Sequence, residues 1–127
     1  MRVTGEDMQL YAVTDTQWLN GKDFLSVIES VLANGATFLQ LREKNATHEE
    51  IVKKAMAIKP IAKKYGVPFV IDDDIYAAKE ADADGVHIGQ SDADYKTARA
   101  VLGEGKIIGM TVKTKEQAEN AIRMGAD

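Results

Sequence analysis

Short apolar segments alternate along the chain with longer segments in which apolar residues recur every three or four positions. The first pattern is typical of buried strands and the second of amphipathic helices, so the alternation predicts five strand–helix units. The predicted strands cover residues 9–14, 37–41, 68–71, 85–89 and 106–110. They are apolar on both faces, which favours a parallel sheet covered by helices over an antiparallel sheet with one wet face.

The segments between the predicted strands carry helix signals. In the first of them, one apolar stripe repeats at helical spacing: Phe24, Val27, Ile28, Val31 and Leu32. Thr47 and Glu50 are spaced as a capping box, and Thr114 opens the last predicted helix. Asp74 is the expected N-cap of a short helix over residues 75–81.

The composition narrows the class of protein. At 127 residues, with 45% hydrophobic and 28% charged residues, the chain fits a single domain over residues 1–127. Its net charge of -4 provides no basic field for nucleic acid. No apolar run approaches the roughly 18 residues of a membrane span, and the absence of cysteine fits a reducing compartment. We therefore expect a cytoplasmic protein whose partners are neither nucleic acids nor membranes.

Charged and amide side chains follow the end of every predicted strand. They lie at Asp15, at residues 40–44, at residues 72–74, at residues 90–92 and at Lys113. Parallel α/β proteins bind their ligands beyond the carboxyl ends of the strands, so these side chains are expected around one mouth.

Alternation along the second strand separates the charged residues at its end. It places Gln40, Arg42 and Lys44 on one face and Leu41 with Glu43 on the other. Carboxylates that follow the third and fourth strands suit a hard divalent cation such as Mg²⁺. Arg42 and Lys44 are then left to hold phosphate oxygens. The pattern predicts a metal–diphosphate site.

Each of these features also has an ordinary structural interpretation. The three aspartates at 72–74 can serve as a helix cap, Arg42 to Lys44 as a solvated turn, and His87 as a packed strand residue. Lys113 is as readily a solvent-facing loop residue as a ligand contact. Their joint placement at the strand ends favours a binding site.

Four segments together resemble successive motifs of the thiamine phosphate synthase family. They are QLREK at 40–44, VPFVIDDD at 67–74, ADGVHIGQSD at 83–92 and IIGMT at 107–111. The resemblance extends over nearly the whole chain and implies a (β/α)8 TIM barrel. It also implies thiamine biosynthesis by a transferase that joins hydroxymethylpyrimidine diphosphate to thiazole phosphate and releases diphosphate.

The resemblance implies a role for each matching residue. Arg42 and Lys44 would grip the diphosphate as catalytic residues, and Asp73 and Asp92 would ligate Mg²⁺. The residues that the resemblance assigns to substrate binding are Gln40, Leu41, Arg42, Glu43, Lys44, Asp72, His87 and Thr111. Asp72 departs from the family, which usually has Asn there, and adds a negative charge beside the diphosphate.

The number of strand–helix units is smaller than a TIM barrel needs. Such a barrel takes about 250 residues, whereas this chain supplies five units, so we expect an incomplete barrel that lacks the thiazole-phosphate side of the site. An isolated half-barrel without turnover, excised or designed, fits the sequence equally. Two unpaired sheet edges would favour association into a homo-oligomer.

Two other classes of protein have a similar pattern. A thiazole tautomerase-like paralogue shares the fold but uses a His near the fifth strand end, where this chain has Lys113. A non-enzymatic receiver-like domain with a flavodoxin-like doubly wound sheet also has five units in this length. Receivers need paired acids after the first strand, where this chain has the single Asp15.

Overall fold

A computed structural model describes residues 3–90 and 94–127. Within these residues a five-stranded sheet contains β1 (Tyr11–Val13), β2 (Phe38–Leu41), β3 (Phe69–Asp72), β4 (Gly85–Ile88) and β5 (Ile107–Met110). The helices are η1 (Thr16–Trp18, a 3-10 helix), α1 (Phe24–Ala33), α2 (His48–Tyr65), α3 (Ile75–Glu80), α4 (Tyr95–Leu102) and α5 (Lys115–Met124). The predicted alternation of strands and helices is confirmed; η1 is an element that the periodicity did not indicate.

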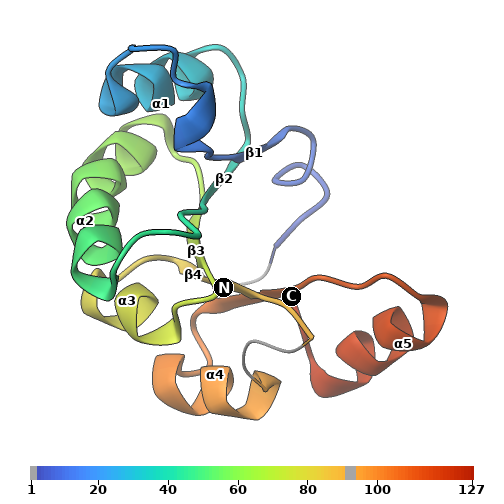
Figure 1. Cartoon of the computed structure of the whole chain (residues 1–127). Coiled ribbons are helices and arrows are strands. Elements are labelled where there is room, and N and C mark those ends of the chain that lie inside the picture. The colour runs from blue at the N-terminus through green and yellow to red at the C-terminus, as the bar shows by residue number, and fades with distance from the viewer. Residues whose placement is uncertain (1–2, 91–93) are drawn as a thin grey trace.

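The strands follow one another in space in the order of the chain. Each is parallel to its neighbour, from β1 at one edge to β5 at the other. Helices α1 to α5 form an arc around one side of this sheet (Figure 1). A flavodoxin-like sheet has the order 2-1-3-4-5 with helices on both faces, whereas the strands here follow the order β1-β2-β3-β4-β5.

The predicted helix starts are confirmed by their caps. The side chains of Thr47 and Glu50 form a reciprocal capping box at the start of α2. Asp74 accepts a hydrogen bond from the Ala77 N–H at the start of α3, as expected. None of the helices in the described parts of the chain is long and apolar enough to cross a membrane.

Side-chain oxygens cap the first N–H groups of several strands and so align them. The Leu10 N–H donates to the Thr37 hydroxyl at 2.8 Å, just before β1, which is shorter than the predicted residues 9–14. Asp84 accepts in the same way from the Phe69 N–H at 2.8 Å. These bonds fix the starts of neighbouring strands relative to one another.

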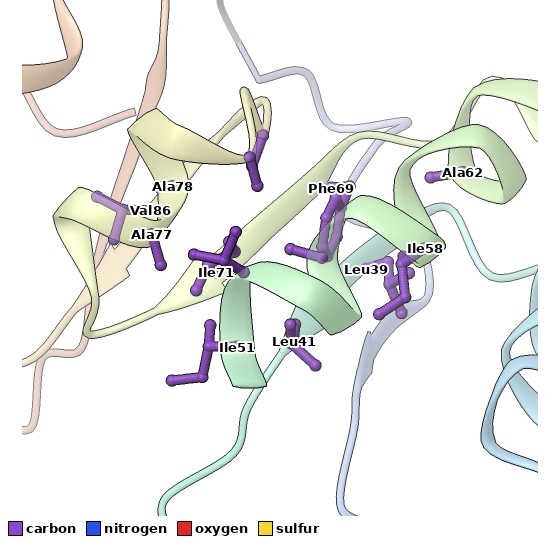
Figure 2. Close-up of a cluster of buried hydrophobic side chains, with 14 of the residues drawn as sticks. Leu39, Leu41, Ile51, Ile58, Ala62, Phe69, Ile71, Ala77, Ala78 and Val86 are labelled. Carbon is purple, nitrogen blue, oxygen red and sulfur yellow. The ribbon is translucent and has the colours of Figure 1, made fainter. Parts of the chain in front are cut away.

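The two faces of the sheet have different environments. On the outer face, strand residues such as Leu39, Leu41 and Ile71 pack under helices and are at most 1% exposed. Figure 2 shows them against side chains of α2, including Ile51 and Ile58. This layer accounts for most of the core, and truncating one such residue to Ala costs about 2–5 kcal/mol.

The inner face is most apolar toward the amino ends of the strands. Phe38, Val70 and Ile107 form a small second cluster there, with Tyr11 and Val3 packed against it. Polar residues occupy the same face toward the carboxyl ends. The ligand-binding end of the sheet therefore lies above a hydrophobic floor.

One glycine allows a close approach on the inner face. A Cβ built at Gly85 would lie 2.0 Å from the backbone carbonyl oxygen of Ile107 on the neighbouring strand. The carbonyl cannot rotate away, because it belongs to the parallel ladder between β4 and β5. Gly85 thus permits the pairing that brings these two strand ends together.

We predict that Gly85→Ala lowers the free energy of unfolding by about 1–3 kcal/mol or more, because the new methyl group must displace backbone. Chemical denaturation monitored by circular dichroism measures the change. Gly105→Ala is the matched control, since a Cβ there meets nothing within 4 Å. Equal stability of the two variants would contradict the close approach.

Candidate functional site

A cleft of about 660 Å³ opens at the carboxyl ends of the strands. It collects side chains from β2, β3 and β4 and from the segment after β5. The predicted site residues that line it are Gln40, Arg42, Lys44, Asp72, Asp73, His87 and Thr111. The expectation that the strand ends surround one mouth is confirmed for these residues.

Register and alternation together explain this gathering. Gln40 pairs with Val13 of β1, and Asp72 pairs with His87 of β4. All four side chains face inward, because alternate residues of a strand share a face. Arg42 and Lys44 continue the inward series beyond the end of β2 and line the same cleft.

Gln40 is held by an aromatic pair on the inner face. Its side chain is 5% exposed, and its Nε2 donates to the Tyr11 hydroxyl at 2.8 Å. The Tyr11 ring stacks on Phe38 with 4.6 Å between ring centroids. The amide of Gln40 is therefore fixed at the edge of the hydrophobic floor, where it can orient a flat polar ligand.

The backbone of Arg42 is tied to the first strand. The buried Thr14 hydroxyl accepts a hydrogen bond from the Arg42 N–H at 2.9 Å. The Thr14 N–H in turn donates to the Gln40 carbonyl at 3.0 Å. These bonds hold the chain beyond β2 in an extended form, so that Arg42 keeps its inward direction.

Arg42 and Lys44 meet the two carboxylates that follow β3. The Lys44 ammonium lies 3.0 Å from Asp72 Oδ2 and also contacts Asp73 Oδ2. Arg42 Nε lies 4.0 Å from Asp72 Oδ2. The hydrogen bonds to Asp73 and then to Asp72 raise the pKa of Lys44 above its ordinary value. Lys44 is therefore charged throughout the neutral range.

The turn after β3 adopts an uncommon backbone conformation. Asp73 has φ of 65°, in the left-handed region, which Asp tolerates better than most residues. Its N–H donates to the His87 carbonyl at 2.8 Å, and the Asp74 N–H donates to the Asp72 carbonyl at 2.8 Å. This turn directs Asp73 toward Lys44 while Asp74 caps α3.

His87 contributes a polar group to the cleft from β4. Its Nε2 is 2.9 Å from the Thr111 hydroxyl oxygen, so that the two residues share a hydrogen bond. A Cβ at Gly109 would lie 2.6 Å from His87 Nδ1, so this glycine makes room for the ring. Burial lowers the pKa of His87 below its ordinary value, and the ring is neutral at pH 7.

Two residues assigned to substrate binding do not line the cleft. Leu41 is 1% exposed and belongs to the core under the helices. Glu43 also points outward, where it forms an ion pair with Lys54 at 3.2 Å and accepts from the Thr16 hydroxyl at 3.4 Å. Both lie an odd number of residues from Gln40, and because side chains alternate along a strand, both face outward. We therefore leave their side chains out of the site.

The predicted metal ligands are only partly described. Asp92 lies outside the described residues, whereas Asp73 lines the cleft. Among residues 3–90 and 94–127, no group of three His, Asp or Glu side chains is arranged to hold a metal ion. The carboxylates of Asp72 and Asp73 are the acidic groups that the described chain brings to the cleft.

Three further polar side chains of the described residues line the cleft: Gln90 and Lys113, which the sequence places at its mouth without a binding role, and Gln117, which it does not place there. Gln90 donates to the Thr111 carbonyl at 3.0 Å, and Lys113 and Gln117 line the same space. Gln90 and Lys113 follow strand ends, and this signal placed both around the mouth in the sequence interpretation. Gln117 lies inside α5 and carried none, because only the folded chain turns that helix face toward the strands.

A parallel α/β sheet with a charged cleft at its carboxyl ends belongs to the class of α/β proteins whose sites are built from strand-end loops. A model of the family described as thiamine monophosphate synthase matches residues 10–127. The chain therefore belongs to the thiamine monophosphate synthase family.

Individual relatives agree with this membership. The thiamine-phosphate synthase of Clostridioides difficile is 46% identical over 120 residues, covering 94% of this chain and 57% of the relative. That of Persephonella marina is 42% identical over 121 residues, covering 95% and 58%. The solved thiamine phosphate pyrophosphorylase from Pyrococcus furiosus is 31% identical, with a TM-score of 0.88 over 96% of this chain and 58% of that one. The chain thus spans less than two thirds of the length of these relatives.

The two histidines of the chain are predicted to titrate on opposite sides of the ordinary histidine pKa of about 6.5. Hydrogen bonds to Glu80 and Asp74 raise the pKa of His48, whereas burial lowers the pKa of His87. The stabilisation from His48 is present at low pH and lost as the pH rises through its pKa. Folding opposes protonation of His87, which destabilises the fold as the pH falls below about 6.5.

NMR titration of the imidazole signals measures both pKa values. His48→Gln is the control, since it removes the signal that titrates at the higher pH and so assigns both. A pKa of His87 at or above that of His48 would contradict the burial of the His87 ring.

Proposed function

We propose that residues 1–127 form the pyrimidine diphosphate-binding part of a thiamine phosphate synthase. The reaction would join hydroxymethylpyrimidine diphosphate to thiazole phosphate and release diphosphate. The observation that supports this most directly is the convergence of Gln40, Arg42 and Lys44 with Asp73 and Thr111 around one cleft. Membership of the thiamine monophosphate synthase family supports the same substrates.

The proposed architecture is one partial (β/α)8 barrel domain over residues 1–127. Consecutive parallel strands with helices on one side support it. So does the TM-score of 0.88 against the pyrophosphorylase from Pyrococcus furiosus, of which this chain covers 58%. The thiazole-phosphate side of the site would come from structure outside the five strand–helix units.

In the proposed reaction the carbon–oxygen bond to the diphosphate breaks, and the diphosphate leaves with the electron pair. The electron-rich pyrimidine carries the resulting cation until the thiazole nitrogen donates its lone pair to the same carbon. No protein nucleophile takes part. Arg42 and Lys44 would stabilise the charge that develops on the leaving group, and the Thr111 hydroxyl would donate to one of its oxygens. Gln40 and His87 would face the pyrimidine.

The donor groups at the end of β3 fit Mg²⁺. They are carboxylate oxygens, which a hard cation prefers, and the Lys44 ammonium already lies between Asp72 and Asp73, so this position attracts positive charge. Asp73 and Asp92 would hold the ion. When bound, Mg²⁺ would supply further positive charge against the leaving diphosphate.

A cytoplasmic location and the absence of nucleic acid or membrane partners are part of the proposal, on the basis of the net charge of -4 and the small-molecule substrates. β1 and β5 are edge strands of the sheet, and Val13, the last residue of β1, is 49% exposed. Association of chains through these edges, which light scattering measures, is likewise a proposal.

No contact favours the alternatives. Lys113 rather than a histidine lines the cleft after β5, where a thiazole tautomerase-like paralogue would use His. Asp15, which a receiver-like domain would use in an acidic pair, instead accepts a hydrogen bond from the Gln17 N–H at 3.1 Å and caps η1.

We predict that the chain binds hydroxymethylpyrimidine diphosphate in Mg²⁺ and that EDTA weakens this binding, as isothermal titration calorimetry would measure. Arg42→Ala is expected to weaken it about 10- to 100-fold, the loss of one charge-assisted hydrogen bond. Arg123→Ala, on an exposed turn of α5, removes the same charge away from the cleft and should bind normally. Equal losses in both variants, or no binding by the folded chain, would contradict the proposal.

Asp72, the acidic residue at the position where the family usually has Asn, is expected to weaken diphosphate binding. Asp72→Asn keeps the shape of the side chain but removes a negative charge next to Arg42 and Lys44, so pyrimidine diphosphate affinity should rise about tenfold. The same titration measures it. Asp82→Asn is the control for net charge, since Asp82 lies at the opposite end of the sheet with Lys59 and Lys106. Weaker binding by Asp72→Asn would show that Asp72 mainly holds the two cations in place.

A further inference from the structure

Lys113 approaches the cleft from the side opposite Arg42 and Lys44. It belongs to the segment between β5 and α5, whereas the other two cations follow β2. The backbone N–H of Lys113 donates to Gln117 Oε1 at 2.7 Å. The N–H of Gln117 donates to the hydroxyl of the N-cap residue Thr114 at 3.1 Å. The start of α5 therefore fixes the backbone from which the Lys113 side chain extends.

The charges around the cleft are unequally balanced. Lys44 lies against Asp72 and Asp73, and Arg42 lies near Asp72, so both cations have carboxylate partners. Lys113 forms no ion pair with any carboxylate in residues 3–90 and 94–127. Of the three cations that line the cleft, Lys113 is therefore the one that no carboxylate of the described residues neutralises.

A diphosphate carries negative charge at both of its phosphate groups. Cations on the β2 side alone would neutralise only the part of the anion that faces them, and their charge is already shared with Asp72 and Asp73. A cation on the β5 side, where Thr111 also lines the cleft, would oppose the remaining charge.

We propose that Lys113 is a third diphosphate-binding cation, which contacts the leaving group from the β5 side of the cleft. This inference rests on the proposed function, because it concerns the same anionic ligand. It assigns a role to a residue that the motifs at residues 40–44 and 72–74 do not include.

Inorganic diphosphate is the probe, titrated calorimetrically into the 127-residue chain in Mg²⁺ at fixed ionic strength. Lys113→Met should weaken its binding about tenfold or more. Lys113→Arg should restore most of the affinity, since it keeps the charge. The matched control is Lys115→Met: Lys115 is 90% exposed, pairs with Glu119 on α5 and does not line the cleft. Its affinity should stay within about twofold of the parent chain.

The outcomes separate this inference from the function on which it rests. If Arg42→Ala weakens diphosphate binding while Lys113→Met binds like the parent chain, the role of Lys113 is wrong and the proposed function stands. If the parent chain does not bind diphosphate at all, both are overturned. A fall in affinity that Lys113→Arg fails to restore would also count against a role for the charge. Unfolding midpoints of all variants, measured in the same buffer, identify any loss that comes from misfolding.

Discussion

Burial of the outward-facing strand side chains under the helices determines the direction of every other residue in the sheet. Leu39 and Leu41 cannot leave the helix-covered face without exposing large apolar surfaces to water. Gln40 between them must then point inward, as must Arg42 after them. A slip of one residue in β2 would reverse all of these directions. The positions of the polar groups in the cleft thus depend on apolar packing on the other side of the sheet.

The parallel ladder converts these directions into a single site. Because neighbouring strands pair in parallel and in register, residues from β2, β3 and β4 reach one cleft although they lie far apart in the chain. Glycine permits this at the inner face, where Gly85 allows backbone contact and Gly109 makes room for His87. The same sheet thus packs closely against the helices on its outer face and leaves the cleft open on its inner face.

The charges of the cleft compete with one another before any ligand binds. Lys44 is held by Asp72 and Asp73, which keeps its position but shares its charge. The proposed diphosphate ligand would therefore have to displace or share these contacts. The acidic residue Asp72 makes this competition stronger than Asn would. Lys113, which forms no ion pair within residues 3–90 and 94–127, consequently matters for the proposed balance of charge.

The amino-acid sequence by itself determined the order of strands and helices, several of the helix caps and the inward series of Gln40, Arg42 and Lys44. These follow from periodicity and from short-range hydrogen bonding, which act within a few residues. Sequence spacing alone did not decide that Glu43 pairs with Lys54 on the outer face, or that Gln117 turns toward the cleft. Only the tertiary structure decided these, because they depend on how separate elements pack against one another, and local patterns carry no information about that packing.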